Sequence, residues 1–141
     1  MALICHITQR TNWERATAEG RYMADTLHSQ GFIHCSTPQQ VIPVANFLFR
    51  GKADLVLLGI DESLVQSNIR YENLEGGTKL FPHIYGLLNL DAIIRVMDFP
   101  PREDGTFELP GEVEELNSDL TEPSVSTLGN QSIRTTWPSV P

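Results

Sequence analysis

The sequence predicts a single α+β domain with a mixed or antiparallel split β-sheet, two main helices and an acidic tail. Three observations lead to this fold class. The chain has 141 residues, and one domain takes about 100–200 residues. Short apolar or alternating segments recur along it, and residues 55–60 (LVLLGI) are the clearest buried strand. Between these segments, two stretches carry the start signals and apolar spacing of helices.

Apolar spacing and helix-ending glycines place the elements in order. Strands alternate their side chains between two faces, whereas helices repeat apolar residues at i, i+3, i+4 and i+7. Gly20, Gly31 and Gly51 are expected to end helices. The expected elements are a strand at 2–8, a helix capped by Thr11 or Asn12 that runs to 18, a short strand at 21–24, a helical turn at 25–30, a strand at 32–36, a helix at 37–50, strands at 55–60 and 69–72, a loop or edge strand at 79–85, and a strand at 92–98.

The helix expected after residue 36 has the strongest start signal. Thr37 fits the N-cap, Pro38 the first helical position, and Gln40 the position three residues after the cap. Pro43 falls inside this helix, where it is expected to remove one hydrogen bond and to introduce a kink. The apolar residues follow the helical period, at Val41, Val44, Ala45, Leu48 and Phe49.

The composition changes after Pro110. We expect a folded domain over residues 1–110 and an acidic Ser/Thr/Pro-rich tail over 111–141 that is disordered or loosely docked. Such a composition buries too little apolar area to offset chain entropy, so the tail should be dispensable for folding. Ile133 and Trp137 are the exceptions that could dock on the domain.

The net charge, the apolar runs and the cysteine content argue against several classes of function. The formal net charge of −8 argues against a nucleic-acid-binding face, which needs a basic patch. No apolar run reaches the ~18 residues of a membrane span, and the N-terminal residues do not form a signal peptide. The two cysteines, Cys5 and Cys35, are then expected as free thiols of a cytoplasmic protein.

Three otherwise apolar strings contain polar groups: CHIT at 5–8, GFIHCSTP at 31–38 and FPHIYG at 81–86. A strand that runs directly into a helix is a common place for ligand-binding groups in α/β-type folds. Strand alternation sets His6 opposite Cys5, and His34 opposite Cys35. If both cysteines face one core, both histidines face a common cleft; otherwise they are two separate half-buried histidines.

His83 and Glu72 are further candidates. His83 lies between Pro82 and Ile84 and precedes Tyr85, so the segment either holds a ring against a ligand or forms a rigid surface turn. Glu72 shares a strand face with Arg70, which fits a surface ion pair of about 0–1 kcal/mol. Alternatively, Glu72 is a carboxylate that stabilises positive charge on a sugar ring.

Other chemistries have weaker support. His6, His34 and His83 could bind zinc, but no two of them have a local ligand spacing. Cys35 could be the nucleophile of a Cys/His hydrolase, although adjacent strand residues such as His34 point to the opposite face. No glycine-rich phosphate-binding loop is present in the sequence.

The chain resembles the DUF952 family of unknown function. The resemblance covers about residues 2–110 and rests on the three strings above together with YMADTL at 22–27, DLVLL at 54–58 and RYE at 70–72. It implies a fold similar to the ADP-ribosyltransferase-like superfamily, a split sheet with a cleft for NAD. Under that resemblance His6 holds ribose hydroxyls, with Thr8 beside it, and Ile7 stands where a glycine is common. Such analogy of fold does not by itself establish function.

The resemblance also assigns roles to later residues. His34 and Ser36 would contact the base or nicotinamide amide, and Glu72 or His83 would stabilise an oxocarbenium-like transition state. The N–H groups of a helix start at Thr37 suit an anion, and the Tyr85 ring can stack on a ligand. We therefore expect a small-molecule ligand, with NAD as the suspected cofactor, and an enzyme or relic enzyme. The alternatives are a non-catalytic binding module and an interaction domain with structural histidines; the oligomeric state is open.

Overall fold

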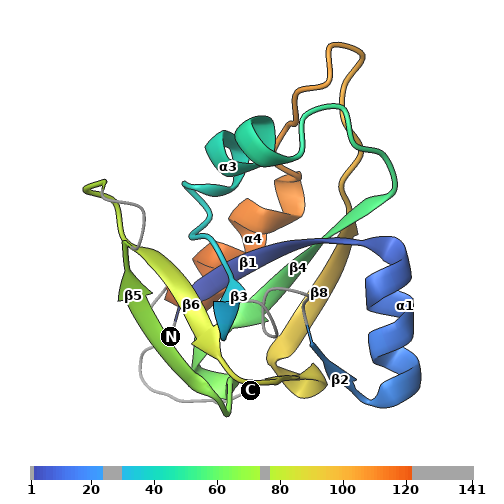
Figure 1. The fold of residues 1–141 in the computed structure, drawn as a ribbon. Helices are drawn as coiled ribbons and strands as arrows, with labels where there is room; N and C mark the ends of the chain where they lie inside the picture. The colour runs from blue at the N-terminus through green and yellow to red at the C-terminus, as the bar shows by residue number, and fades with distance from the viewer. Residues whose placement is uncertain (1, 24–29, 74–76, 122–141) are drawn as a thin grey trace.

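Antiparallel pairing organises the described residues, which are 2–23, 30–73 and 77–121 of this computed structural model (Figure 1). The strand orders are β1-β4-β8, β2-β7 and β3-β6-β5. These sheets and the helices confirm the predicted single α+β domain. The elements are β1 (Leu3–Gln9), α1 (Arg10–Glu19), β2 (Arg21–Tyr22), β3 (Ile33–His34), α3 (Val41–Leu48), β4 (Leu55–Asp61), η1 (Glu62–Leu64), β5 (Asn68–Glu72), β6 (Phe81–Tyr85), β7 (Leu88–Asn89), η2 (Leu90–Ala92), β8 (Ile93–Asp98) and α4 (Gly111–Thr121).

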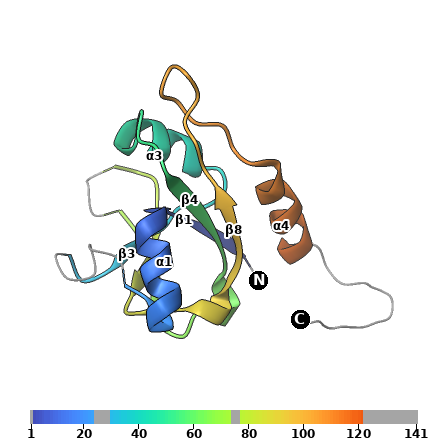
Figure 2. The ribbon, with the colours of Figure 1, turned by 90° about the vertical axis from the view of Figure 1, so that its right-hand side faces the viewer.

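Strand β4 is the centre of the molecule. All of its residues are buried, as the predicted apolar run requires for a strand covered on both faces. Helices α1 and α4 lie on opposite sides of the β1-β4-β8 sheet (Figure 2). One core joins alternate residues of β1 and β4 to α3 and α4, and the other joins the intervening residues to α1, β3 and β6. The two-residue period of β1 therefore sends Cys5 to the first core and Ile4 to the second.

Helix α1 begins two or three residues earlier than a cap at Thr11 or Asn12 would place it. Its N-cap is Gln9, which makes no side-chain capping bond, so neither Thr11 nor Asn12 caps the helix. The strand β1 runs directly into the helix, and this continuity sets the start. The expected end is confirmed: Gly20 has φ +80° and donates its N–H to the Ala16 carbonyl at 2.8 Å. The helical turn expected at 25–30 lies mostly outside the described residues.

Helix α3 begins later than the capping pattern predicts. Thr37 does donate its N–H to Gln40 Oε1 at 3.0 Å, as a capping box requires. However, Gln40 N–H bonds back to the Thr37 carbonyl at 2.9 Å, so these residues close a separate turn and the helix starts at Val41. The expected interior proline, Pro43, is then in the first helical turn, where its missing N–H has no intrahelical partner to lose. The prediction that Pro43 removes a hydrogen bond from the helix interior was wrong for this reason.

Replacing Pro43 by alanine is accordingly expected to change the free energy of unfolding by less than about 1 kcal/mol. An interior proline would instead cost the helix about 3 kcal/mol, and its removal would stabilise the protein by a similar amount. Chemical denaturation of the wild type and Pro43→Ala distinguishes a first-turn position of Pro43 from an interior one. A gain of several kcal/mol in the variant would contradict the first-turn placement.

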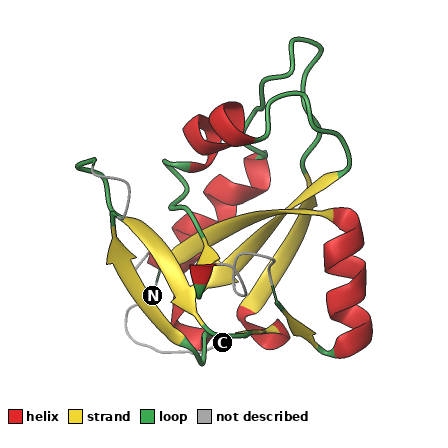
Figure 3. Cartoon of the chain, viewed as in Figure 1, coloured by secondary structure: helices red, strands yellow, loops and turns green. Residues whose placement is uncertain are grey.

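The segment at 79–85 was expected to be a loop or an edge strand, and this is wrong. Strand β6 lies between β5 and β3, in the centre of its sheet (Figure 3). Pro82 is tolerated there because it contributes its carbonyl, which accepts the Cys35 N–H at 3.0 Å. Because β3 is only two residues long, this side of β6 needs few donors. His83 consequently occupies a rigid strand position.

Residues 111–121 differ from the predicted tail. They form α4, in which Val113 and Leu116 are buried in the first core and Leu120 packs against it. Pro110 precedes the helix and accepts the Val113 N–H at 3.0 Å. The expectation of a disordered or loosely docked tail is therefore wrong for 111–121, while 122–141 lie outside the described residues.

Candidate functional site

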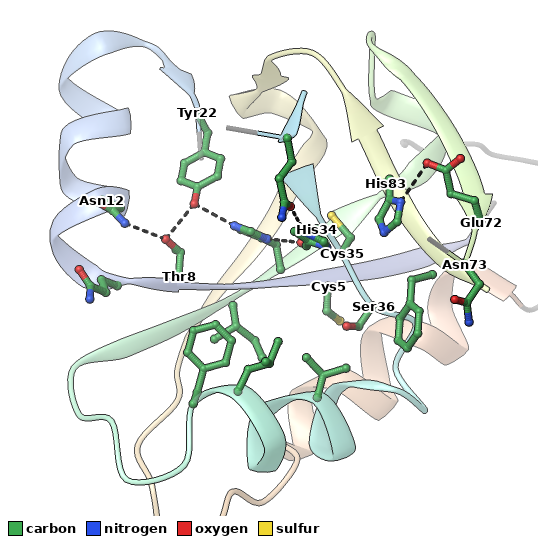
Figure 4. Close-up of a pocket in the computed structure, with 18 residues that line it drawn as sticks. Cys5, Thr8, Asn12, Tyr22, His34, Cys35, Ser36, Glu72, Asn73 and His83 are labelled. Carbon is green, nitrogen blue, oxygen red and sulfur yellow. Dashed lines mark hydrogen bonds and ion pairs between the residues drawn. The ribbon is translucent and has the colours of Figure 1, made fainter. Parts of the chain in front are cut away.

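A cavity of about 530 Å³ opens between β1, β3, β6 and α3 (Figure 4). A backbone bridge between Cys5 and Ser36 brings β1 next to the end of β3, with both N–H···O distances below 3 Å. This bridge joins the two sheets that carry His6 and His34, and both histidines line the cavity. Sequence alone assumed that arrangement; the tertiary contact supplies it.

The wall at β1 contains a buried chain of hydrogen bonds that starts from His6. His6 Nδ1 lies 2.5 Å from the His34 carbonyl oxygen, and Nε2 lies 2.8 Å from the Tyr22 hydroxyl. The Tyr22 and Thr8 hydroxyls share a bond of 2.8 Å, and Asn12 donates its side-chain N–H to Thr8 Oγ1 at 3.4 Å. Both ring nitrogens of His6 are thus engaged by the protein itself.

A carbonyl oxygen only accepts, which fixes the tautomer of His6. The proton must be on Nδ1, so Nε2 of the neutral ring accepts from the Tyr22 hydroxyl, and the Thr8 hydroxyl then donates to Tyr22. Burial lowers the pKa of His6 to about 4, against a smaller opposing effect of its bond to the His34 carbonyl. The ring is therefore neutral near pH 7, and every hydrogen bond in the chain points the same way.

The opposite wall holds a second group around Glu72. His83 donates Nδ1–H to Glu72 Oε1 at 3.0 Å, and the Tyr85 hydroxyl donates to the same oxygen. These two donors lower the pKa of Glu72, chiefly the Tyr85 bond, and the Glu72 bond raises the pKa of Tyr85. The Arg70 guanidinium lies over the Tyr85 ring, 5.0 Å from its centroid. The expected simple Arg70–Glu72 ion pair is replaced by an arrangement in which Glu72 holds His83.

Aromatic contacts fix the rings between the two walls. Phe32 stacks on His83 with centroids 4.2 Å apart and meets His34 edge-on at 4.7 Å. His34 and His83 are themselves edge-on at 5.1 Å. His34 is exposed at the cavity mouth, where Nε2 lies 2.5 Å from Gln30 Oε1. His34 and His83 therefore lie side by side and line the cavity together with apolar residues of α3.

The cysteines occupy different cores. Cys5 belongs to the core with α3 and α4, and Cys35 to the core with α1 and β6, so the shared core assumed from the sequence was wrong. The two histidines still reach one cavity because β1 and the end of β3 are bridged. Burial raises the pKa of both thiols, that of Cys5 to about 12. This keeps Cys35 protonated, which argues against its role as a nucleophile.

Most of the predicted site residues line the cavity: His6, Thr8, His34, Ser36, Glu72 and His83. Thr37 and Tyr85 do not line it. The Thr37 N–H is taken by Gln40 and no helix starts there, so the expected anion site is wrong. Tyr85 is held by Glu72 and covered by Arg70, so its ring does not offer the expected stacking face.

Sequence reasoning missed several cavity residues, among them Asn12, Tyr22, Gln30 and Asn73. Tyr22 carried a usable signal, because it is the aromatic residue of the short strand expected at 21–24 and ends up 1% exposed with a polar hydroxyl. Asn12 was assigned to a helix cap instead. Asn73 follows the end of β5 and Gln30 precedes β3, so no periodic pattern indicates where either side chain points.

Two negative findings apply to the described residues. No group of three or more His, Cys, Asp or Glu side chains there is arranged to hold a metal ion, which leaves the three-histidine zinc hypothesis without support. Within the same residues, none of the helices combines the length and the apolar character that a membrane crossing requires.

Comparisons with known proteins place the chain in a family. A family model described as "Protein of unknown function (DUF952)" matches residues 7–96. The crystal structure of protein CC0527 from Caulobacter crescentus is similar, with a TM-score of 0.73, 32% identity, and coverage of 80% of this chain and 99% of that one. Its solution NMR structure gives a TM-score of 0.68 and 34% identity over 77% of this chain and 94% of that one. No curated protein sequence matches. The family match and these similarities show that the chain belongs to the DUF952 family of proteins of unknown function.

Proposed function

We propose that the cavity binds a small polar, ring-bearing molecule, and that the nucleoside part of an NAD-class nucleotide is the first candidate. The observation that carries this is the cavity of about 530 Å³ whose walls carry imidazoles, hydroxyls and the Glu72 carboxylate. Its volume is in the range of about 300–1,000 Å³ that small-molecule sites occupy. Val44 and Leu48 of α3, with Phe49 at its C-cap, supply an apolar wall against which a ring can pack.

The charge of the lining limits which part of a nucleotide fits. Among the described residues, the lining includes Glu72 but no lysine or arginine. A pyrophosphate inside the cavity would have no cationic partner and would face the ionised carboxylate. The base and ribose fit the donors and acceptors of the walls, and a phosphate would have to lie toward the open mouth. This favours nucleosides and singly or doubly charged nucleotides over a fully enclosed dinucleotide.

Catalysis of the ADP-ribosyltransferase type is the finer form of this proposal. It is supported by the place of His6 on the first strand and of Glu72 beside the cavity. A specific observation favours the second candidate, a binding module without catalysis: both His6 nitrogens are engaged by Tyr22 and the His34 carbonyl. With that geometry His6 cannot hold ribose hydroxyls unless the Tyr22 bond breaks.

Replacing His34 by alanine is expected to weaken ADP-ribose or NAD binding by at least about tenfold, because it removes an exposed imidazole at the mouth of the cavity. Isothermal titration measures this, and circular dichroism checks that the fold is retained. Glu14→Ala, an exposed position on α1 outside the cavity lining, is the matched control and should bind like the wild type. Equal binding in wild type and His34→Ala, or no binding in either at millimolar ligand, would reject the nucleotide proposal.

A further inference from the structure

We propose that His83, and not His6, contacts the ligand inside the cavity, alongside His34 at its mouth, and that His83 Nε2 accepts a hydrogen bond from an N–H or O–H group of that ligand. His6 is then a positioning residue. The inference rests on the proposed binding function of the cavity and adds to it the residue and the hydrogen-bond polarity by which the ligand is recognised.

His6 has no capacity left for a ligand. The residue is 8% exposed, its Nδ1 donates to the His34 carbonyl, and its Nε2 accepts from the Tyr22 hydroxyl. The first of these bonds fixes the backbone of β3 at the residue whose side chain reaches the cavity mouth. The second connects His6 to Thr8 and Asn12. His6 therefore holds His34 in place and orders one wall.

His83 has one nitrogen left. The ionised Glu72 carboxylate accepts only, so the bond at 3.0 Å places a proton on His83 Nδ1, and in the neutral tautomer with that proton the lone pair is on Nε2. The residue is 4% exposed, and among the described residues no protein group bonds to Nε2. A buried acceptor without a partner is costly, by about 1–3 kcal/mol. Figure 4 shows the ring turned with Nδ1 toward Glu72, which leaves its other edge toward the cavity interior.

The ring of His83 is also held in one orientation. Phe32 stacks on the His83 ring at an interplanar angle of 25°. The His34 ring meets the His83 ring edge-on, at an interplanar angle of 83°. Glu72 in turn is held by Tyr85. An acceptor nitrogen held in one place selects ligands that present an amide, amino or hydroxyl hydrogen to it. It disfavours a ligand carboxylate or phosphate, because the lone pairs of these groups would face the lone pair of Nε2 and the negative charge of Glu72.

The test uses the full chain labelled with 15N in histidine and three probes: NAD, adenosine and nicotinamide. A long-range 1H–15N spectrum reports each ring nitrogen, and His83→Phe and His6→Gln assign the signals. We expect a probe to move His83 Nε2 upfield, as accepting a hydrogen bond does, while both His6 nitrogens stay in place. His83→Phe keeps the ring stack but removes the lone pair, and it should weaken that probe at least about tenfold. Glu14→Ala, outside the cavity lining, is the control and should change affinity by less than about twofold.

Each outcome decides one of the two proposals. A shift of His6 rather than His83, or equal affinity of His83→Phe and wild type, overturns the inference, as does the absence of a His83 shift with all three probes. A His83 shift with adenosine or nicotinamide, but no binding of NAD, supports the inference and rejects only the dinucleotide as ligand. If His83→Phe fails to fold, variants of the other three histidines leave the His83 signals by elimination, and the spectrum of the unmutated chain still decides the matter.

Discussion

Removing residues 112–141 is expected to destabilise the protein by about 3–6 kcal/mol, because it deletes two buried side chains of the first core, Val113 and Leu116. Each fully buried side chain of this kind contributes about 1.5–3 kcal/mol. Leu116 packs close to the central strand, where its Cδ1 lies 3.2 Å from the point at which a Cβ on Gly59 would stand. For a domain of this size the melting temperature should fall by more than about 10 °C.

A truncation after Thr121 is the matched control. It keeps every described contact of α4, so its melting temperature should stay within a few degrees of the full chain. The longer deletion also removes the exposed ion pair of Arg95 with Glu112, but this loss adds little, since such pairs are worth about 0–1 kcal/mol. A melting temperature unchanged by the longer deletion would show that α4 adds nothing to the core.

Acidification is expected to cost the wild type about 3 kcal/mol of unfolding free energy through His6 alone. The pKa of His6 is about 4 in the folded protein, against an ordinary 6.5, because the ring is buried. Between pH 6.5 and about 4 the unfolded chain binds a proton at His6 that the folded chain does not. The unfolding free energy therefore falls as the pH falls through this window, and the contribution levels off below about pH 4.

Chemical denaturation of the wild type and His6→Gln at several pH values measures this effect. The difference between the two proteins isolates His6, since other groups titrate in both. The lowered pKa of Glu72 adds its own loss of stability only below the ordinary carboxyl range, so the two windows separate. The pH slope above pH 4.5 should be smaller in the variant; identical slopes would mean that His6 is readily protonated in the fold.

Much of the fold could be predicted because it follows from local pattern. The run at 55–60 is apolar on both faces, and such a segment is stable only between two cores, where β4 lies. Gly20 ends α1 because the helix needs a left-handed residue there, and φ is +80°. The α4 helix could also have been predicted, since Val113, Leu116 and Leu120 follow the helical period within an otherwise polar, Ser- and Glu-rich composition.

By itself, the sequence determined most of the strands, the two faces of β1 and the histidines, hydroxyls and carboxylate that line much of the cavity. The tertiary structure alone decided how those groups are used. His6 and His34 look equivalent in sequence, yet the Cys5–Ser36 bridge leaves one imidazole fully bonded and the other at the mouth. The place of β6 between two strands turned His83 from a loop residue into a fixed acceptor. Side-chain alternation along a strand and secondary-structure propensity depend on neighbouring residues, so they can be predicted from the sequence. The hydrogen-bond partners of these side chains come from segments tens of residues apart, so only the tertiary structure places them.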